Sequence, residues 1–232
     1  LMRMSFMIIV SPSVTSASPT MSAERFIKKN KPRNIDINCI NKVYYKSPRA
    51  MWRFYGYYGG LGVVGGLGWT PKFMKEELRQ LKEELNDQNL PFGVDLALPK
   101  VGGGARKTNH DYTHGQLPEL IDVIIESGAS LFVSAVGIPP VWAIDKLHEN
   151  GILVMNMIGS PRHVQKCLDA GVDILCAQGT EGGGHTGDIS TAVLIPMIVD
   201  FVKGKTSKMH GGPIYVCLLY TSDADDEGLG VD

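Results

Sequence analysis

The sequence predicts an α/β protein with the parallel (β/α)8 TIM-barrel fold, incomplete at both ends. Between residues 59 and 216, amphipathic helical patterns alternate with short apolar segments, and each helix–strand unit takes about twenty residues. Gly128, Gly151 and Gly171 each stand where a helix should end and a strand begin, the usual place for a left-handed cap. Segments such as residues 152–155 are apolar at successive positions, which indicates strands covered on both faces.

The expected elements alternate along the chain. Polar or glycine-rich segments follow several strands, whereas an open doubly wound sheet would concentrate them at one crevice, so a barrel is favoured. About six strands are present, and a barrel would need at least one more strand and helix after residue 216. The predicted strands are residues 61–64, 91–98, 130–136, 152–158, 172–177 and 213–216, and the predicted helices are residues 72–89, 117–127, 140–150, 161–170 and 191–203.

Nothing divides the central part of the chain, so we expect one domain at residues 56–216. Residues 1–55 are predicted to be an irregular basic extension, in which the first strand of the domain is either hidden or missing. Residues 217–232 are predicted to be an irregular acidic tail. The central part has no basic stripe, so nucleic acid is not an expected partner.

Cysteine spacing and hydropathy indicate the cellular compartment in which the protein is expected. Cys39, Cys167, Cys176 and Cys217 show neither close pairing nor the spacing of metal ligands, so free thiols in a reducing compartment are expected. This predicts an intracellular protein, cytoplasmic, or mitochondrial if the arm rich in Ser, Lys and Arg is a transit segment. No apolar run is long enough to cross a membrane, so a membrane is not an expected partner.

Residues 60–65 match the dinucleotide fingerprint G-x-G-x-x-G. That fingerprint needs a strand before its first glycine and a helix directly after it. Here residues 61–64 are themselves strand candidates, and the next helix starts only after Thr70. A Rossmann nucleotide site is therefore disfavoured.

Four of the six histidines give only weak signals of a functional site. His110 and His114 would share a face of a helix and could bind a metal ion, but the glycines at 102–104 disfavour a helix. A mobile or substrate-side loop is favoured there, and no metal site is predicted. His148 and His163 lie in amphipathic helical patterns and are expected to face solvent.

Residues 176–188, CAQGTEGGGHTGD, connect an apolar strand to a helix. The other predicted elements are arranged around this segment. Three successive glycines, 182–184, precede His185, and glycine is tolerated where backbone must approach a flat ligand or take a positive φ. Loops at the carboxyl ends of parallel strands are where ligands bind. We expect His185 to lie over a planar cofactor held by this loop; a flexible surface connection is the alternative.

Residues 177–188, AQGTEGGGHTGD, resemble the nitronate monooxygenase family, once called 2-nitropropane dioxygenases. Residues 59–66, 91–94 and 154–160 are similar to further family segments in the same order, so the resemblance spans residues 59 to about 216. It implies a TIM barrel that contains FMN and oxidises alkyl nitronates with O2. A small nitronate and O2 are then the expected partners, and homo-oligomerisation is left open.

The resemblance also implies roles for individual residues. His185 resembles the active-site histidine beside the flavin, which acts as a base toward the carbon next to the nitro group or orients the nitronate. Gln178 resembles a flavin-contacting residue, as do Gly182, Gly183 and Gly184. Asp95 stands where many members have an asparagine after F-G-V, and a carboxyl group can donate a hydrogen bond only when it is protonated.

Two other functions compete with this one. A flavin-dependent enoyl-acyl-carrier-protein reductase of the same superfamily would share the barrel and the flavin. A truncated, non-catalytic barrel fragment would suit the ends of the chain, which lack the P-M element of the first family strand and the last phosphate-binding loop. Because phosphate is bound by backbone N–H groups of such loops, FMN should bind weakly to a chain without them.

Overall fold

The computed structural model describes residues 6–10, 61–85, 90–98, 111–181 and 187–220. Strands and helices alternate through this part of the chain after the first strand. The elements are β1 (Phe6–Val10), β2 (Gly62–Gly65), α3 (Pro71–Glu84), β3 (Phe92–Ala97), α4 (Leu117–Ser127), β4 (Leu131–Ala135), α5 (Val141–Glu149), β5 (Leu153–Ile158), a 3-10 turn (Pro161–His163), α6 (Val164–Ala170), β6 (Ile174–Ala177), α7 (Thr191–Val202) and β7 (Tyr215–Tyr220).

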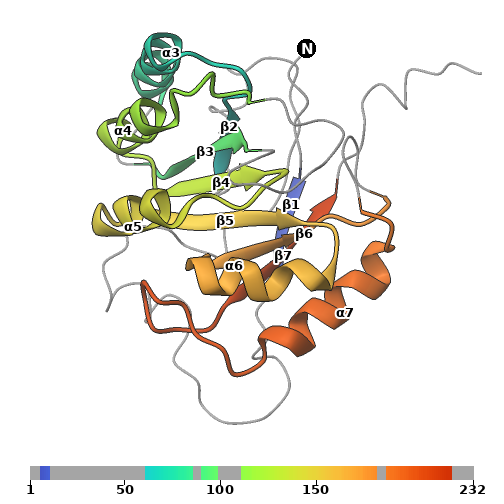
Figure 1. Cartoon of the computed structure of the whole chain (residues 1–232). Helices are drawn as coiled ribbons and strands as arrows, with labels where there is room; N and C mark the ends of the chain where they lie inside the picture. Colours follow the sequence, from blue (N-terminus) through green and yellow to red (C-terminus); the bar gives the residue numbers. More distant parts are fainter. Residues whose placement is uncertain (1–5, 11–60, 86–89, 99–110, 182–186, 221–232) are drawn as a thin grey trace, which may run out of the picture.

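The strands form one sheet in the order β1-β7-β6-β5-β4-β3-β2. The strands from β2 to β7 are parallel, and each is a neighbour of the next in the chain. This order never reverses, so right-handed crossovers place successive helices on the same side of the sheet. Figure 1 shows α3 to α7 following one another around one side of a curved sheet, as in a TIM barrel rather than a doubly wound fold.

Alternation along the strands separates two apolar clusters. The outer cluster packs side chains such as Val94, Val154 and Leu175 against the buried residues of the helices from α3 to α7. The inner cluster contains Val133 and Met155 and, among the described residues, no helical residue at all. The predicted parallel α/β fold is therefore confirmed, with strands apolar at successive positions because both faces are covered.

Local signals explain several element ends. Thr70 caps α3 by accepting a hydrogen bond from the Phe73 N–H through its side chain, and Pro71 follows at the first helical position. Gly128, Gly151 and Gly171 have φ values of 76°, 73° and 105°, so the three predicted left-handed positions are confirmed. Residues 62–65 of the glycine motif form strand β2 itself, which agrees with the disfavoured Rossmann turn.

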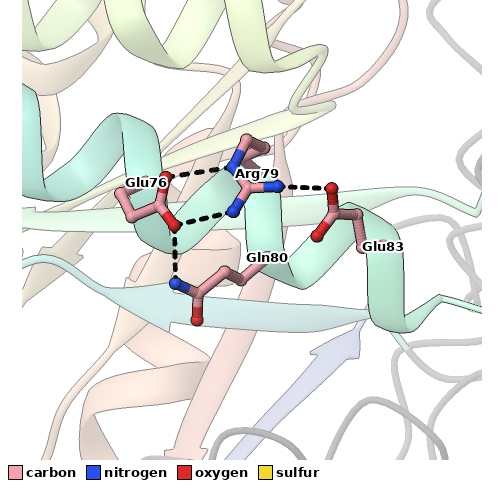
Figure 2. Close-up of polar contacts among 4 residues, drawn as sticks. All are labelled: Glu76, Arg79, Gln80 and Glu83. Carbon is pink, nitrogen blue, oxygen red and sulfur yellow. Dashed lines mark hydrogen bonds and ion pairs between the residues drawn. The ribbon is translucent and has the colours of Figure 1, made fainter.

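Helix α3 exposes a chain of charged groups on its outer surface. Arg79 makes a forked contact with Glu76 and an ion pair with Glu83, and Gln80 donates to Glu76 at 2.7 Å (Figure 2). These hydrogen bonds lower the pKa of Glu76 to about 2. Exposed ion pairs of this kind contribute little to the stability of the fold. Their effect here is to keep the outer face of α3 polar.

The first and last strands in the chain, β1 and β7, lie wholly or partly where irregular segments were expected. Strand β7 continues to Tyr220, into the segment expected to be an irregular tail. Its edge is covered by β1, which lies within the segment expected to be an irregular extension and pairs antiparallel from Phe6 opposite Tyr220 to Val10 opposite Val216. Across the described residues, no helix combines the length and apolar character needed to cross a membrane.

Candidate functional site

The loops that leave β5 and β6 are joined through their backbones at the carboxyl edge of the sheet. The Gln178 N–H donates to the Ile158 carbonyl at 2.9 Å, and the Gln178 carbonyl accepts from the Gly187 N–H at 3.4 Å. A Cβ added to Gly159 would lie 2.8 Å from the Gly187 Cα, which real Cβ atoms essentially never show. Both glycines are therefore required by close contact of two loops, rather than by a positive φ.

Glu181 anchors the same loop to the start of α7. One of its carboxylate oxygens accepts from both the backbone N–H and the hydroxyl of Thr191, each at 2.7 Å. These hydrogen bonds, with a further contact from Thr180, lower the pKa of Glu181 to about 2. A Cβ on Gly179 would lie 2.7 Å from this carboxylate, so glycine is required there too. Glu181 acts here as a helix-capping group.

The loop is thus held at both of its described ends. Thr180 donates its N–H to the Ile189 carbonyl at 3.1 Å, in addition to the contacts of Gln178 and Glu181. The predicted catalytic residue His185 and the predicted flavin contacts Gly182, Gly183 and Gly184 lie between these anchors, outside the described residues. Gln178 is half-buried at the end of β6. The structure therefore fixes where the loop begins and ends, at the edge where barrel sites are found.

Asp95 lies on the inner face of the sheet near the carboxyl end of β3. Its neighbours Val94 and Leu96 belong to the outer cluster, and alternation turns Asp95 to the opposite side. The residue as a whole is half-buried, but its Oδ1 atom is shielded from solvent and has no hydrogen-bond partner among the described residues. Burial raises the pKa of Asp95 to about 7.

Gly65 is the register partner of Asp95 on β2. No atom of the described residues lies within 4 Å of the position that a Cβ of Gly65 would take. An open space beside a glycine and an unpaired buried carboxyl oxygen are features that fit a flat ligand with a polar edge. Asp95 and Gln178 share the carboxyl edge of the sheet but are separated there by β4 and β5.

The turn after β4 is strained. Val136 has a φ of 71°, and the Gly137 N–H donates to the Ala135 carbonyl at 2.9 Å, which closes a three-residue γ-turn. A positive φ is rare for a β-branched residue and costs free energy. The Ser134 hydroxyl supports the turn by donating to the Gly137 carbonyl at 2.8 Å. Backbone strain of this kind is common at functional sites. The sequence contained no clear sign of it.

A buried polar network occupies the opposite, amino-terminal edge of the sheet. Asp173 is fully buried and accepts hydrogen bonds from the Val154 N–H at 2.8 Å and from the Ser207 hydroxyl at 2.5 Å. His148 Nε2 lies 2.8 Å from Asp173 Oδ2, and the His148 side chain is 14% exposed. The expectation that His148 faces solvent is therefore wrong, because its partner lies 25 residues further along the chain.

This network is a structural feature of the barrel floor rather than a catalytic triad. The carboxylate stands between the hydroxyl and the imidazole, whereas nucleophilic catalysis needs the imidazole beside the hydroxyl. The sequence contained one sign of this network: Asp173 is the one charged residue in the segment 172–177. Among the described cysteines, Cys167, Cys176 and Cys217 are free, as predicted, and all three are buried.

Comparison with known proteins supports the fold and identifies the family. The sequence profile of the nitronate monooxygenase family matches residues 57–209. The protein of Mycobacterium tuberculosis named "Putative monooxygenase Rv1533" is 29% identical over 195 residues, 66% of this chain and 52% of that relative. The chain therefore spans about half the length of this curated relative.

Solved structures are similar to the same part of the chain. A mutant of FabK from Thermotoga maritima has a TM-score of 0.50 and 27% identity, over 60% of this chain and 41% of that chain. A nitroalkane oxidase from Streptomyces ansochromogenes has a TM-score of 0.52 over 61% of this chain and 48% of that chain, and at 21% identity it supports the fold alone. By its family profile, its parallel strand order and its helices on one side of the sheet, the chain belongs to the nitronate monooxygenase family of flavin-dependent TIM-barrel oxidoreductases.

Proposed function

We propose that the protein is an FMN-dependent nitronate monooxygenase, which converts alkyl nitronates and nitroalkanes with O2 to carbonyl compounds and nitrite. The family match over residues 57–209 carries this proposal. Two nitronate anions and one O2 balance two carbonyl molecules and two nitrite ions. The bound flavin would supply the electron transfer to O2, and the protein would bind, orient and shield the substrate.

The residues proposed to hold the flavin come from the carboxyl edge of the sheet. Asp95 offers an unpaired carboxyl oxygen beside the open space at Gly65. Gln178, together with Gly182, Gly183 and Gly184, would bring an amide and bare backbone to the same edge. The close packing of Gly159 on Gly187 supports this arrangement, because it ties the loop after β6 to the loop after β5.

His185 is proposed as the catalytic residue. A neutral imidazole titrates near pH 7 and can accept the α-carbon proton of a nitroalkane, which yields the nitronate. With a preformed nitronate this proton is already gone, so the imidazole would only orient the anion. The two roles therefore predict different losses with the two substrates when His185 is replaced.

The experiment compares the wild type with His185→Ala, each loaded with FMN, by O2 consumption and nitrite release. A base role predicts a loss of roughly 100-fold or more in kcat/KM with a nitroalkane and a smaller loss with its nitronate. His163→Ala, at the 3-10 turn before α6, is the matched control and should keep wild-type activity. Unchanged turnover in His185→Ala would reject the assigned role.

Two outcomes would favour the competing functions. Rapid anaerobic reduction of the flavin by NADH or NADPH would favour the enoyl-acyl-carrier-protein reductase. A colourless protein that cannot be reconstituted with FMN would favour the non-catalytic fragment. Flavin absorbance of the purified protein is the first measurement.

A further inference from the structure

Among the described residues, no charged group stands beside the buried carboxyl group of Asp95 to stabilise its ionised form. Its strand neighbours are β2 and β4, and neither contains a titratable side chain. Helices α3 and α4 pack on the other face of the sheet, where Lys75 and Glu126 pair with each other in solvent at 2.8 Å. An isolated carboxylate in such surroundings is costly, whereas the neutral acid is not.

The titratable members of the inner apolar cluster cannot supply a positive charge. Among the described residues they are Cys176, Tyr215 and Cys217, on β6 and β7. His210, whose ring lies against Tyr215, belongs to the turn beside Ser207 at the opposite, amino-terminal edge of the sheet. A thiol or a phenol is either neutral or negatively charged, so none of the three cluster members can stabilise the ionised Asp95 carboxylate. The neutral carboxyl group, in contrast, has one O–H donor to offer.

We propose that Asp95 holds its proton in the folded protein and donates it in a hydrogen bond to an acceptor on the edge of a planar ligand lying against Gly65. The inference rests on the proposed function, in which that ligand is the flavin. The unpaired, solvent-shielded Oδ1 atom and the open space at Gly65 are the two observations that carry it. The raised pKa of Asp95, about 7, agrees with them.

This arrangement makes flavin binding depend on pH. If binding requires the protonated acid, the affinity falls as the free protein loses the Asp95 proton and as the pH rises further. With the pKa of Asp95 at about 7, the Kd for FMN should rise on the order of 50-fold between about pH 7 and about pH 9. The FMN phosphate titrates near pH 6, below this range.

The test uses the full chain and FMN as the probe, with Kd measured by quenching of flavin fluorescence across this pH range. Asp95→Asn keeps a hydrogen-bond donor that does not titrate, so its Kd should stay constant. Asp95→Leu removes the donor and should bind FMN more weakly at every pH, without the steep rise. An infrared band of a protonated carboxyl group, present in the wild type at about pH 6 and absent in Asp95→Asn, is the second readout.

The outcomes separate this inference from the proposed function. FMN binding with the same pH profile in wild type and Asp95→Asn, or no protonated-carboxyl band that the variant lacks, would overturn the role of Asp95 and leave the flavin site standing. Failure of both proteins to bind FMN at any pH would overturn the proposed function together with this inference. A rising wild-type Kd beside a constant Asp95→Asn Kd supports both.

Discussion

The backbones of Gly159 and Gly187 are in contact, although the first follows β5 and the second closes the loop after β6. A Cβ on Gly187 would meet the Gly159 carbonyl oxygen and would lie 2.7 Å from the Gly159 Cα. Backbone atoms cannot move aside as a flexible side chain can. The contact therefore fixes the distance between two loops at the carboxyl edge of the barrel.

Gly187→Ala should destabilise the protein by about 2–4 kcal/mol, because the methyl group forces the two loops apart. The free energy of unfolding from urea titrations measures this effect. Gly65→Ala is the matched control, since no described atom lies within 4 Å of its added Cβ, and it should change stability by less than about 1 kcal/mol. Equal effects of the two substitutions would contradict the close contact.

Asp95→Asn should stabilise the protein at neutral and alkaline pH. In the unfolded chain the carboxyl group ionises near its ordinary pKa of 3.8, whereas the folded protein keeps the proton up to about pH 7. The wild type therefore loses stability relative to the variant as the pH rises between these values, by about 4 kcal/mol in total. The stability difference should be constant above this window, and a difference that does not change with pH would refute the assignment.

Glu181→Gln should weaken the cap on α7 in a pH-dependent way. The pKa of Glu181 is lowered from 4.5 to about 2 in the folded protein, so its contribution is full above pH 4.5 and is lost as the pH falls toward 2. Urea midpoints of wild type and variant should differ near pH 6 and converge toward about pH 3. Midpoints that differ equally at both pH values would argue against the carboxylate as the cap.

Asp173→Ala should cost about 3–5 kcal/mol of stability. It leaves the Val154 N–H, the Ser207 hydroxyl and the His148 ring without the carboxylate that each now contacts. Ser207→Ala removes one member and should cost less, about 1–2 kcal/mol.

Asp169→Ala is the control for the Asp173 substitution. The Asp169 carboxylate is exposed and accepts a hydrogen bond from Gln165 on the same helix, so its loss should stay within about 0.5 kcal/mol. Thermal or urea unfolding of the three variants gives the comparison. An Asp173→Ala protein as stable as Asp169→Ala would show that the network contributes nothing.

Local sequence alone located most of the helices and strands. Helix α4 has the predicted bounds, Leu117 to Ser127, because apolar spacing along one face and Gly128 at its end both act within a few residues. The same holds for α7, which starts at Thr191 as predicted. Periodicity and caps are short-range, so a single sequence contains them in readable form.

The contacts of individual polar side chains could not be read in this way. The outward helical pattern around His148 gave no hint of Asp173, since the pair forms only when α5 and β6 pack together. The strain at Val136 likewise depends on how the turn after β4 is closed. The roles of Gly159 and Gly187 follow from a meeting of two loops, and neither glycine shows it alone.

The sequence by itself determined the alternation of helix and strand, the parallel sheet and the family, because periodicity, glycine caps and the segment AQGTEGGGHTGD are all local properties. The tertiary structure alone decided that Asp95 is buried without a hydrogen-bond partner and that Glu181 caps α7. The physical reason is that solvent exclusion and hydrogen-bond partners are set by strands and loops far apart in the chain, which only the folded sheet brings together.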